Sequence, residues 1–241
     1  MKYDKEVPVM EPGQPGRNRE TGEYFAIHRI ENLQQDFRQH AHPHRHACHA
    51  LVLFTSGSGV HHIDFKDYQV MPGQMYFINQ GQVHYWQVSA DATGYCLFFS
   101  PAFFELHAPA HHGLFQFPFF FNFTDKPFIQ LTEKQQVEML EVFCLAEREG
   151  NHSQRTEDSL LVLWSYLHIL LLKTRQFYQH AAPAGQGPGF HLVQEFELKL
   201  QEHFRKWHSV NDYAEMLHVT PNYLNALSKK LLGKNAKAII N

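Results

Sequence analysis

The sequence predicts a mixed α+β protein, with a β-rich N-terminal region, two flanking helices and a small all-helical C-terminal region. Three observations predict this class. Short apolar runs alternate with turn residues between residues 24 and 99, which is typical of a β-sandwich or barrel. Two longer segments, at about 131–149 and 157–178, have the length and apolar content of helices. The C-terminal region carries paired helix start and stop signals.

The β region is divided by clear turn sequences, SGSG at 56–59, PG at 72–73 and NQGQ at 79–82. The expected strands are YFAIHRI, ALVLFT, YQV, QMYFI, VHYWQV and GYCLFF. Successive side chains alternate between the two faces of a strand, so one of His61 and His62 is expected to face inward and the other outward. The aromatic run FPFFFNF, at 117–123, is expected to pack in the core.

The flanking helices raise the question of a second subunit. The segment SLLVLWSYLHILLLKTRQFY is apolar nearly all round, so it must be buried in a protein of this class. Its own β region and a partner subunit are the two covers that we consider, and the sequence leaves both open. The helix at 131–149 offers a similar surface, made of Val137, Met139, Leu140, Phe143 and Cys144.

Composition sets the broad class. The chain has 241 residues, 44% of them hydrophobic, and a formal net charge of −3. The charge is +2 over residues 191–241 and −5 over 1–190, so the C-terminal end is the more basic one. Three widely spaced cysteines suit a reducing cytoplasm. The most apolar run is shorter than the roughly 20 residues that a membrane span needs, so we expect a cytoplasmic protein without a membrane partner.

The segment SVNDYAEMLHVTPNYLNALSKKLLGK, residues 209–234, predicts two short helices joined by a tight turn. Ser209 and Asp212 have the spacing of a capping box. Thr220 is placed to cap the second helix, and Pro221 occupies its first position, where a missing N–H costs nothing. Gly233 is expected to end that helix.

The two faces of the second helix differ. Leu224, Leu227 and Leu231 form an inner apolar face. The outward positions hold Asn222, Asn225, Ala226, Lys229 and Lys230. Amides can read adenine edges and lysines can neutralise phosphates, so this pattern favours a DNA-binding helix-turn-helix. The alternative is an ordinary helical hairpin with a solvated polar face.

This segment, with a preceding helix at 196–208, resembles the first half of the AraC/XylS-type DNA-binding domain. The resemblance implies base contacts from Asn222, Asn225 and Ala226, although the family often has Arg or another polar residue where Ala226 stands. It implies a DNA-facing set of Thr220, Asn222, Tyr223, Asn225, Ala226, Lys229 and Lys230. Members of the family carry a second such unit after a joining helix. That helix would start at Lys237, and the sequence given ends at Asn241, which suggests a fragment or a shortened product.

The β region also resembles the family, whose sensing domain is a cupin-like jelly roll. The matching residues are PHRH at 43–46 and the stretch from Gly57 to Trp86. The resemblance implies a site for a small polar effector, such as a sugar, lined by His44, His46, Tyr76, His84 and Trp86. The domains expected are an arm at 1–20, the jelly roll at 21–130, a helical dimerisation segment at 131–180, a linker at 181–189 and the DNA-binding segment at 190–241.

Three of the histidines could also hold a metal ion. His44 and His46 alternate and would point the same way from a strand, and His84 could converge on them. Three imidazoles are a suitable set for zinc, iron or nickel. Metal-binding cupins add a Glu, whose position falls on Ala50, and AraC-type sensing domains usually keep His here without a catalytic metal. We therefore expect no cofactor and no resident metal, with these three histidines as the candidates for one.

The sequence as a whole predicts a transcription regulator and not an enzyme, because it contains no catalytic constellation. Expected partners are double-stranded DNA, a small-molecule effector, a second copy of the chain and RNA polymerase. One alternative is a metal-dependent cupin enzyme, which would use the histidines but give no role to residues 196–234. Another is a shortened chain that pairs with a full-length regulator.

Overall fold

The computed structural model describes residues 7–10, 24–33, 42–106, 114, 117–120, 127–151, 156–181, 189–204, 206–232 and 234–240. The chain divides into two compact units, residues 1–181 and 182–241. The first unit combines antiparallel sheets with helices and the second is helical, as the predicted α+β class requires. Gly233 and most of the expected arm and linker lie outside the described residues.

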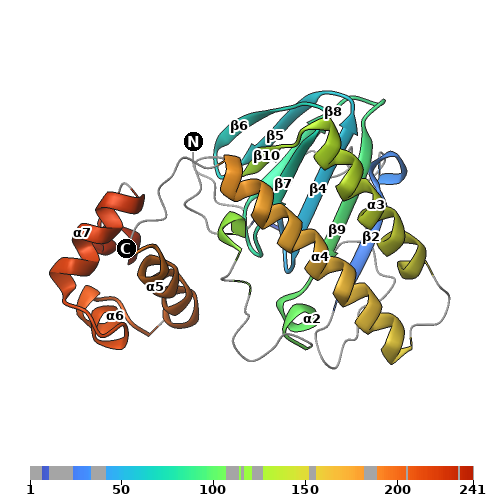
Figure 1. The fold of residues 1–241 in the computed structure, drawn as a ribbon. Coiled ribbons are helices and arrows are strands. Elements are labelled where there is room, and N and C mark those ends of the chain that lie inside the picture. Colours follow the sequence, from blue (N-terminus) through green and yellow to red (C-terminus); the bar gives the residue numbers. More distant parts are fainter. Residues whose placement is uncertain are drawn as a thin grey trace. The chain divides into compact units, whose positions relative to one another are not determined.

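A five-stranded antiparallel sheet forms the centre of the first unit, with the strand order β10-β7-β4-β9-β2 (Figure 1). The bounds are β2 Phe25–Arg29, β4 His49–Ser56, β7 Gln74–Ile78, β9 Thr93–Phe99 and β10 Phe128–Gln130. Val52 on β4 lies opposite Tyr76 on β7 and Cys96 on β9. β2, β4, β7 and β9 coincide with predicted strands, which are thereby confirmed, whereas β10 lies outside the strands that the sequence predicted.

A second sheet has the order β6-β5-β8, formed by Lys66–Val70, Gly59–Ile63 and His84–Val88. Its register pairs His61 with Trp86 and Ile63 with His84. A third, parallel pair joins β1, Val9–Met10, to β3, Arg45–His46. The backbone N–H of Arg45 donates to the carbonyl of Pro8 at 3.0 Å. Part of the expected arm is therefore paired with the strand that carries His46.

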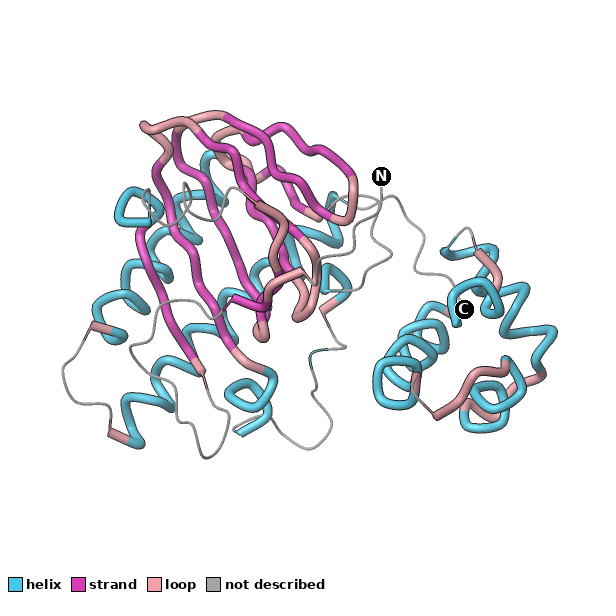
Figure 2. The backbone as a smooth tube through the Cα atoms, turned by 180° about the vertical axis from the view of Figure 1, so that it is seen from behind, coloured by secondary structure: helices cyan, strands magenta, loops and turns pink. Residues whose placement is uncertain are grey.

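The side chains of the larger sheet divide between two cores, as strand alternation requires. On β4, Leu51 and Leu53 join the core beneath helices α3, Glu133–Gly150, and α4, Glu157–Ala181. Val52 and Phe54 join a separate core with side chains of the smaller sheet, such as Trp86. Figure 2 shows the strands in front and these helices behind them. The second core therefore lies between the two sheets.

The two helices bury one side each. Helix α3 begins with a capping box between Thr132 and Gln135. Helix α4 ends at Ala181, three residues beyond the predicted end at 178. Of the two covers that the sequence left open, the unit's own core is the one that buries Met139 and Phe143, which are both fully buried in it. Neither helix, nor any other among the described residues, is long and apolar enough to cross a membrane.

Apolar side chains nevertheless remain on the outer sides of both helices. They are Val137 and Leu145 on α3 and Leu161, Val162 and Ile169 on α4, each between 38% and 57% exposed. The shorter elements of this unit are η1 Ile30–Leu33, α2 Pro101–Leu106 and η3 Pro118–Phe120. Phe117, Phe119 and Phe120 are buried, so core packing of the aromatic run is confirmed for its described part.

The second unit contains α5 Phe190–His203, α6 Val210–Met216, α7 Pro221–Leu232 and α8 Ala236–Ile240. The prediction of a helix at 196–208 is wrong in its bounds. Helix α5 begins earlier because Val193 continues the buried stripe of Phe196. Helix α5 ends at His203. Beyond it, the chain is tied to α6, because the carbonyl of Trp207 accepts a hydrogen bond of 3.0 Å from the Tyr213 hydroxyl.

Candidate functional site

Three histidines from separate parts of the first unit converge between the sheets. The backbones of His44 and His84 exchange two hydrogen bonds, of 3.1 and 2.9 Å. The ring centroids lie 4.9 Å apart for His44 and His46, 4.6 Å for His44 and His84, and 5.0 Å for His46 and His84. Their exposed fractions are 3%, 9% and 2% in the order His44, His46, His84. The predicted convergence of the three rings is confirmed.

Tyr76 and Trp86 lie beside this cluster, in the core between the sheets. Their rings meet edge to face, with centroids 5.2 Å apart. The Tyr76 hydroxyl is 2.9 Å from Gln74 Oε1 and 3.1 Å from the Gln69 carbonyl. Because that hydroxyl already has partners, Tyr76 offers chiefly its ring to a ligand. All five residues predicted for effector binding are thus close together on the inner side of the sheets.

His61 belongs to the same cluster, although it is not among the site residues that the sequence predicts. It is fully buried, its Nε2 lies 3.2 Å from His84 Nδ1, and its ring stacks on Trp86. Its position opposite Trp86 on the neighbouring strand is the signal that could have identified it. His62 faces outward and pairs with Asp67 at 2.6 Å, which confirms the predicted alternation.

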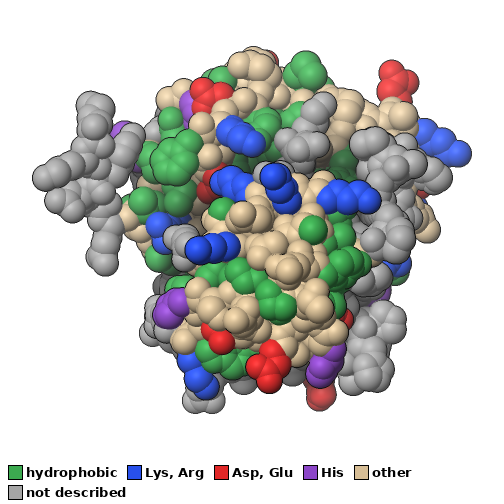
Figure 3. Space-filling model, turned by 90° about the vertical axis from the view of Figure 1, so that its left-hand side faces the viewer, with side chains coloured by type: hydrophobic (Ala, Val, Ile, Leu, Met, Phe, Trp, Pro, Cys, Tyr) green, Lys and Arg blue, Asp and Glu red, His purple; other side chains and the backbone are tan. Residues whose placement is uncertain are grey.

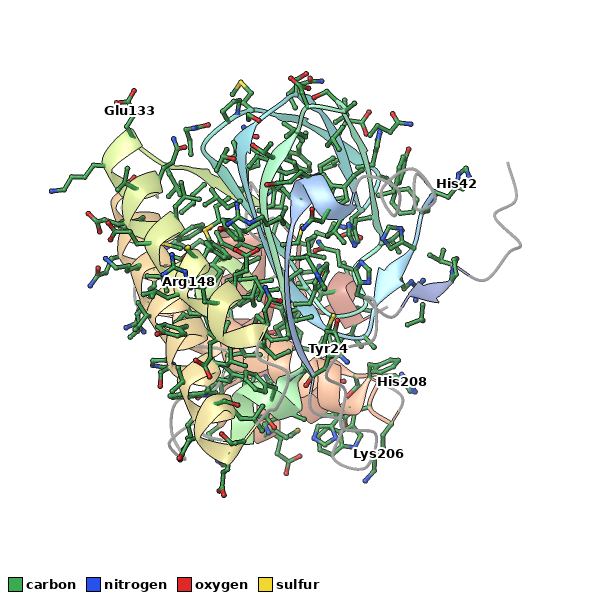
Figure 4. The ribbon with its side chains drawn as sticks, turned by 90° about the vertical axis from the view of Figure 1, so that its right-hand side faces the viewer. Tyr24, His42, Glu133, Arg148, Lys206 and His208 are labelled. Atoms are coloured by element: carbon green, nitrogen blue, oxygen red, sulfur yellow. The ribbon has the colours of Figure 1, made fainter. Side chains whose placement is uncertain are left out.

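Two members of the cluster, His61 and His84, are neutral around neutral pH. Burial lowers the pKa of both His61 and His84 well below the usual value, and neighbouring imidazoles lower it further. A neutral imidazole has one N–H donor and one lone pair. The Nδ1–H of His44 donates to the carbonyl of His42 at 2.9 Å, because a carbonyl can only accept. This bond leaves the lone pair of His44 on Nε2. His42 itself is exposed, at the edge of the sheets (Figure 4).

His49 lies on β4 but points to the other core. Its ring packs on Phe99 and Phe120, with centroids 5.5 and 5.0 Å away, and Gln80 N–H donates to its Nδ1 at 3.4 Å. Burial lowers the pKa of His49 to about 4, and a hydrogen bond with Asn79 opposes this shift. This histidine is therefore separate from the cluster of His44, His46, His61 and His84.

The lowered pKa of His49 predicts acid sensitivity. The unfolded chain takes up a proton near the ordinary value of 6.5 and the folded chain only near 4, so the free energy of unfolding falls as the pH drops through this window. Between about pH 7 and about pH 5, the free energy of unfolding should therefore fall by about 1–2 kcal/mol less in His49→Gln than in the wild type. Urea unfolding at both pH values measures this. An identical loss in the two proteins would contradict it.

A second candidate surface is the outer side of α7. Thr220 Oγ1 accepts a hydrogen bond from the Tyr223 N–H at 3.2 Å, and Ser209 and Asp212 form the predicted capping box of α6. Leu224 and Leu227 are buried on the inner side. The exposed residues are Thr220, Asn222, Tyr223, Ala226, Lys229 and Lys230. Figure 3 shows several Lys and Arg side chains close together on the face that it presents.

Asn225 differs from the other residues predicted to face DNA. It is only partly exposed, and its Oδ1 accepts a hydrogen bond of 3.2 Å from the backbone N–H of Lys237. The side chain therefore connects α7 to the first turn of α8. Its amide oxygen is already engaged, so its NH₂ group is the part that remains for a base. No pattern within α7 itself indicates this contact, because the partner lies 12 residues further along the chain.

Three solved structures resemble this chain at low sequence identity. The AraC-like transcriptional activator CuxR is 15% identical with a TM-score of 0.39, over 76% of this chain and 61% of that chain. ToxT from Vibrio cholerae with bound unsaturated fatty acid is 9% identical with a TM-score of 0.45, over 90% of this chain and 76% of that one. A variant of B. subtilis oxalate decarboxylase is 16% identical with a TM-score of 0.22, over 47% of this chain and 29% of that one.

No curated protein matches the chain significantly. The chain spans 61% of the length of the CuxR chain that it matches. A family model described as "AraC-like ligand binding domain" matches residues 28–162, which include most of the two antiparallel sheets and the converging histidines. Since this match covers more than half of the 241 residues, the chain belongs to the family of proteins with an AraC-like ligand binding domain.

Proposed function

We propose that the chain is a sequence-specific DNA-binding transcription regulator whose first unit binds a small-molecule effector. The observation that carries this proposal is the form of α7. It has a capped N-terminus, a buried leucine face and an exposed face with an amide, Asn222, and two lysines, Lys229 and Lys230. The AraC-like ligand binding domain that precedes it supports an effector-responsive role.

DNA recognition would use α7 in the major groove. Asn222 is exposed near the N-terminal end, where a recognition helix contacts base edges. Lys229 and Lys230 lie in the last turns and would contact phosphates, which gives affinity without sequence information. Asn225 would have a different role, because its side-chain oxygen already accepts a hydrogen bond from the first turn of α8. It would contribute mainly by fixing the helix geometry and by donating from its NH₂ group.

Effector binding would use the cluster between the sheets. His44, His46 and His84 bring imidazole groups together, while Tyr76 and Trp86 add aromatic surface. This combination suits a small polar molecule with hydrogen-bonding groups and a flat or apolar face. If the effector changes DNA affinity, DNA must change effector affinity by the same factor. A verified ligand that changes neither affinity would contradict the regulatory part of the proposal.

A homodimer through α3 and α4 completes the proposed assembly. The outer sides of these helices carry five exposed apolar side chains, which a second copy of the chain would remove from water. Leu161 and Ile169 lie two turns apart on one side of α4, where a second copy could cover them. Sedimentation of the double variant Leu161→Glu/Ile169→Glu should show a monomer where the wild type is a dimer. A wild-type monomer at high concentration would contradict this proposal.

Selection of bound duplexes from a random-sequence DNA pool tests the proposed function. We expect an enriched motif with the wild type and none with Asn222→Ala/Lys229→Ala. This pair is a better control than one that includes Asn225→Ala, since loss of Asn225 would also remove its hydrogen bond to α8. Circular dichroism establishes that the control variant is folded. Absence of enrichment with the folded wild type would contradict sequence-specific binding by this chain.

A further inference from the structure

The histidine cluster contains a buried ring nitrogen whose ligand the proposed function does not name. Nε2 of His84 is buried and has no hydrogen-bond partner among the described residues. Either His84 Nδ1 or His61 Nε2 can be the donor of the hydrogen bond between them, and His84 Nε2 has no partner in either case. Buried polar atoms are normally satisfied, so an unsatisfied one requires an explanation. For a ring nitrogen that carries a lone pair, one explanation is a metal ion that accepts this lone pair and is not part of the chain.

The neighbouring rings supply the other donors that such an acceptor needs. One ring nitrogen from each of His44, His46 and His84 lies within 4.8 Å of the other two. At Zn–N distances of about 2.0–2.1 Å, a tetrahedral ion places its ligand nitrogens roughly 3.3 Å apart. Modest rotation of the rings would close the difference. These are the only three His, Cys, Asp or Glu side chains in the described parts of the chain that converge in this way.

The outer contacts of His44 and His84 also fit. Metal-bound histidines almost always donate their second nitrogen to a carbonyl or another acceptor, which fixes the tautomer. His44 donates Nδ1–H to the His42 carbonyl, so its lone pair is on Nε2. His84 can donate Nδ1–H to His61 Nε2, which leaves the lone pair of His84 on the unsatisfied Nε2.

We propose that His44, His46 and His84 bind one divalent transition-metal ion of the zinc class, with His61 as the positioning residue of His84. A set of three neutral imidazoles suits zinc, nickel, copper or iron and leaves at least one position for water or another ligand. This inference is independent of DNA binding, because a metal ion can be counted on the isolated chain whether or not it regulates transcription.

Titration of the chelator-treated chain with Zn²⁺ and with Co²⁺ tests the proposal. We expect one ion per chain by calorimetry, and a Co²⁺ visible spectrum typical of four or five ligands. X-ray absorption of the zinc-loaded wild type should count three imidazoles, and this result does not depend on any variant being folded. An ion bound through fewer imidazoles, or no stoichiometric ion, would overturn the proposal.

Variants separate this site from the other histidines of the chain. His44→Gln and His84→Gln should lose the stoichiometric ion, whereas His62→Gln, on the outward side of the same strand as His61, should keep it. His61→Phe preserves an aromatic ring against Trp86 and should keep the stoichiometry with about 10–100-fold weaker affinity. Unchanged binding in His84→Gln would show adventitious surface ligation and overturn the proposal. Unchanged affinity in His61→Phe would overturn the role of His61.

Discussion

Leu224→Ala is expected to unfold the C-terminal unit and abolish DNA binding, while the N-terminal unit stays folded. Leu224 is fully buried in a core with Phe196, Tyr213 and Ala236. Truncation of a buried leucine costs about 2–5 kcal/mol, and a domain of roughly 60 residues rarely has more stability than that. The loss should therefore remove most of the stability of residues 182–241.

Hydrogen exchange followed by mass spectrometry measures both units in one experiment. Peptides from α5 to α7 should lose protection in Leu224→Ala, and peptides from β4 and β9 should keep it. Tyr223→Ala is the matched control, since Tyr223 is the preceding residue but 48% exposed, and its effect should be below about 0.5 kcal/mol. Loss of protection in β4 and β9 would show that the two units are not energetically independent.

Replacement of both Lys229 and Lys230 by alanine should flatten the dependence of log K on log salt by about 2. Each lysine that neutralises a phosphate releases a counterion, so its removal subtracts about one unit from the slope. The same effect should weaken binding at about 0.1 M salt by roughly 10–100-fold. Both side chains are exposed, so the folded unit should be preserved. Binding isotherms at several salt concentrations measure the slope.

A control with the same change in net charge isolates the phosphate contacts. Lys66→Ala/Lys134→Ala removes two exposed lysines from the first unit and should leave the slope unchanged. If the control flattens the slope equally, the effect comes from overall charge and not from α7. If neither double variant changes the slope, Lys229 and Lys230 face solvent in the complex.

Local features of the sequence predicted much of the helical unit. The caps of α6 and α7 depend on side chains and N–H groups three residues apart, as in Ser209 with Asp212 and Thr220 with Tyr223. Such hydrogen bonds form within one turn, so spacing alone indicates them. The outer bounds of α5 were less predictable, because they depend on which apolar residues the core of that unit accepts.

The pattern of alternating side chains likewise predicted most of the strands, the common direction of His44 and His46, and the possible convergence of His84 on them. The tertiary structure alone decided which other groups meet them. His61 contacts His84 through the register of β5 and β8, and Asn225 reaches Lys237 across two helices. Both contacts join residues 12 or more positions apart. Their existence depends on how separate elements pack, whereas strand alternation and helix capping are properties of a few consecutive residues.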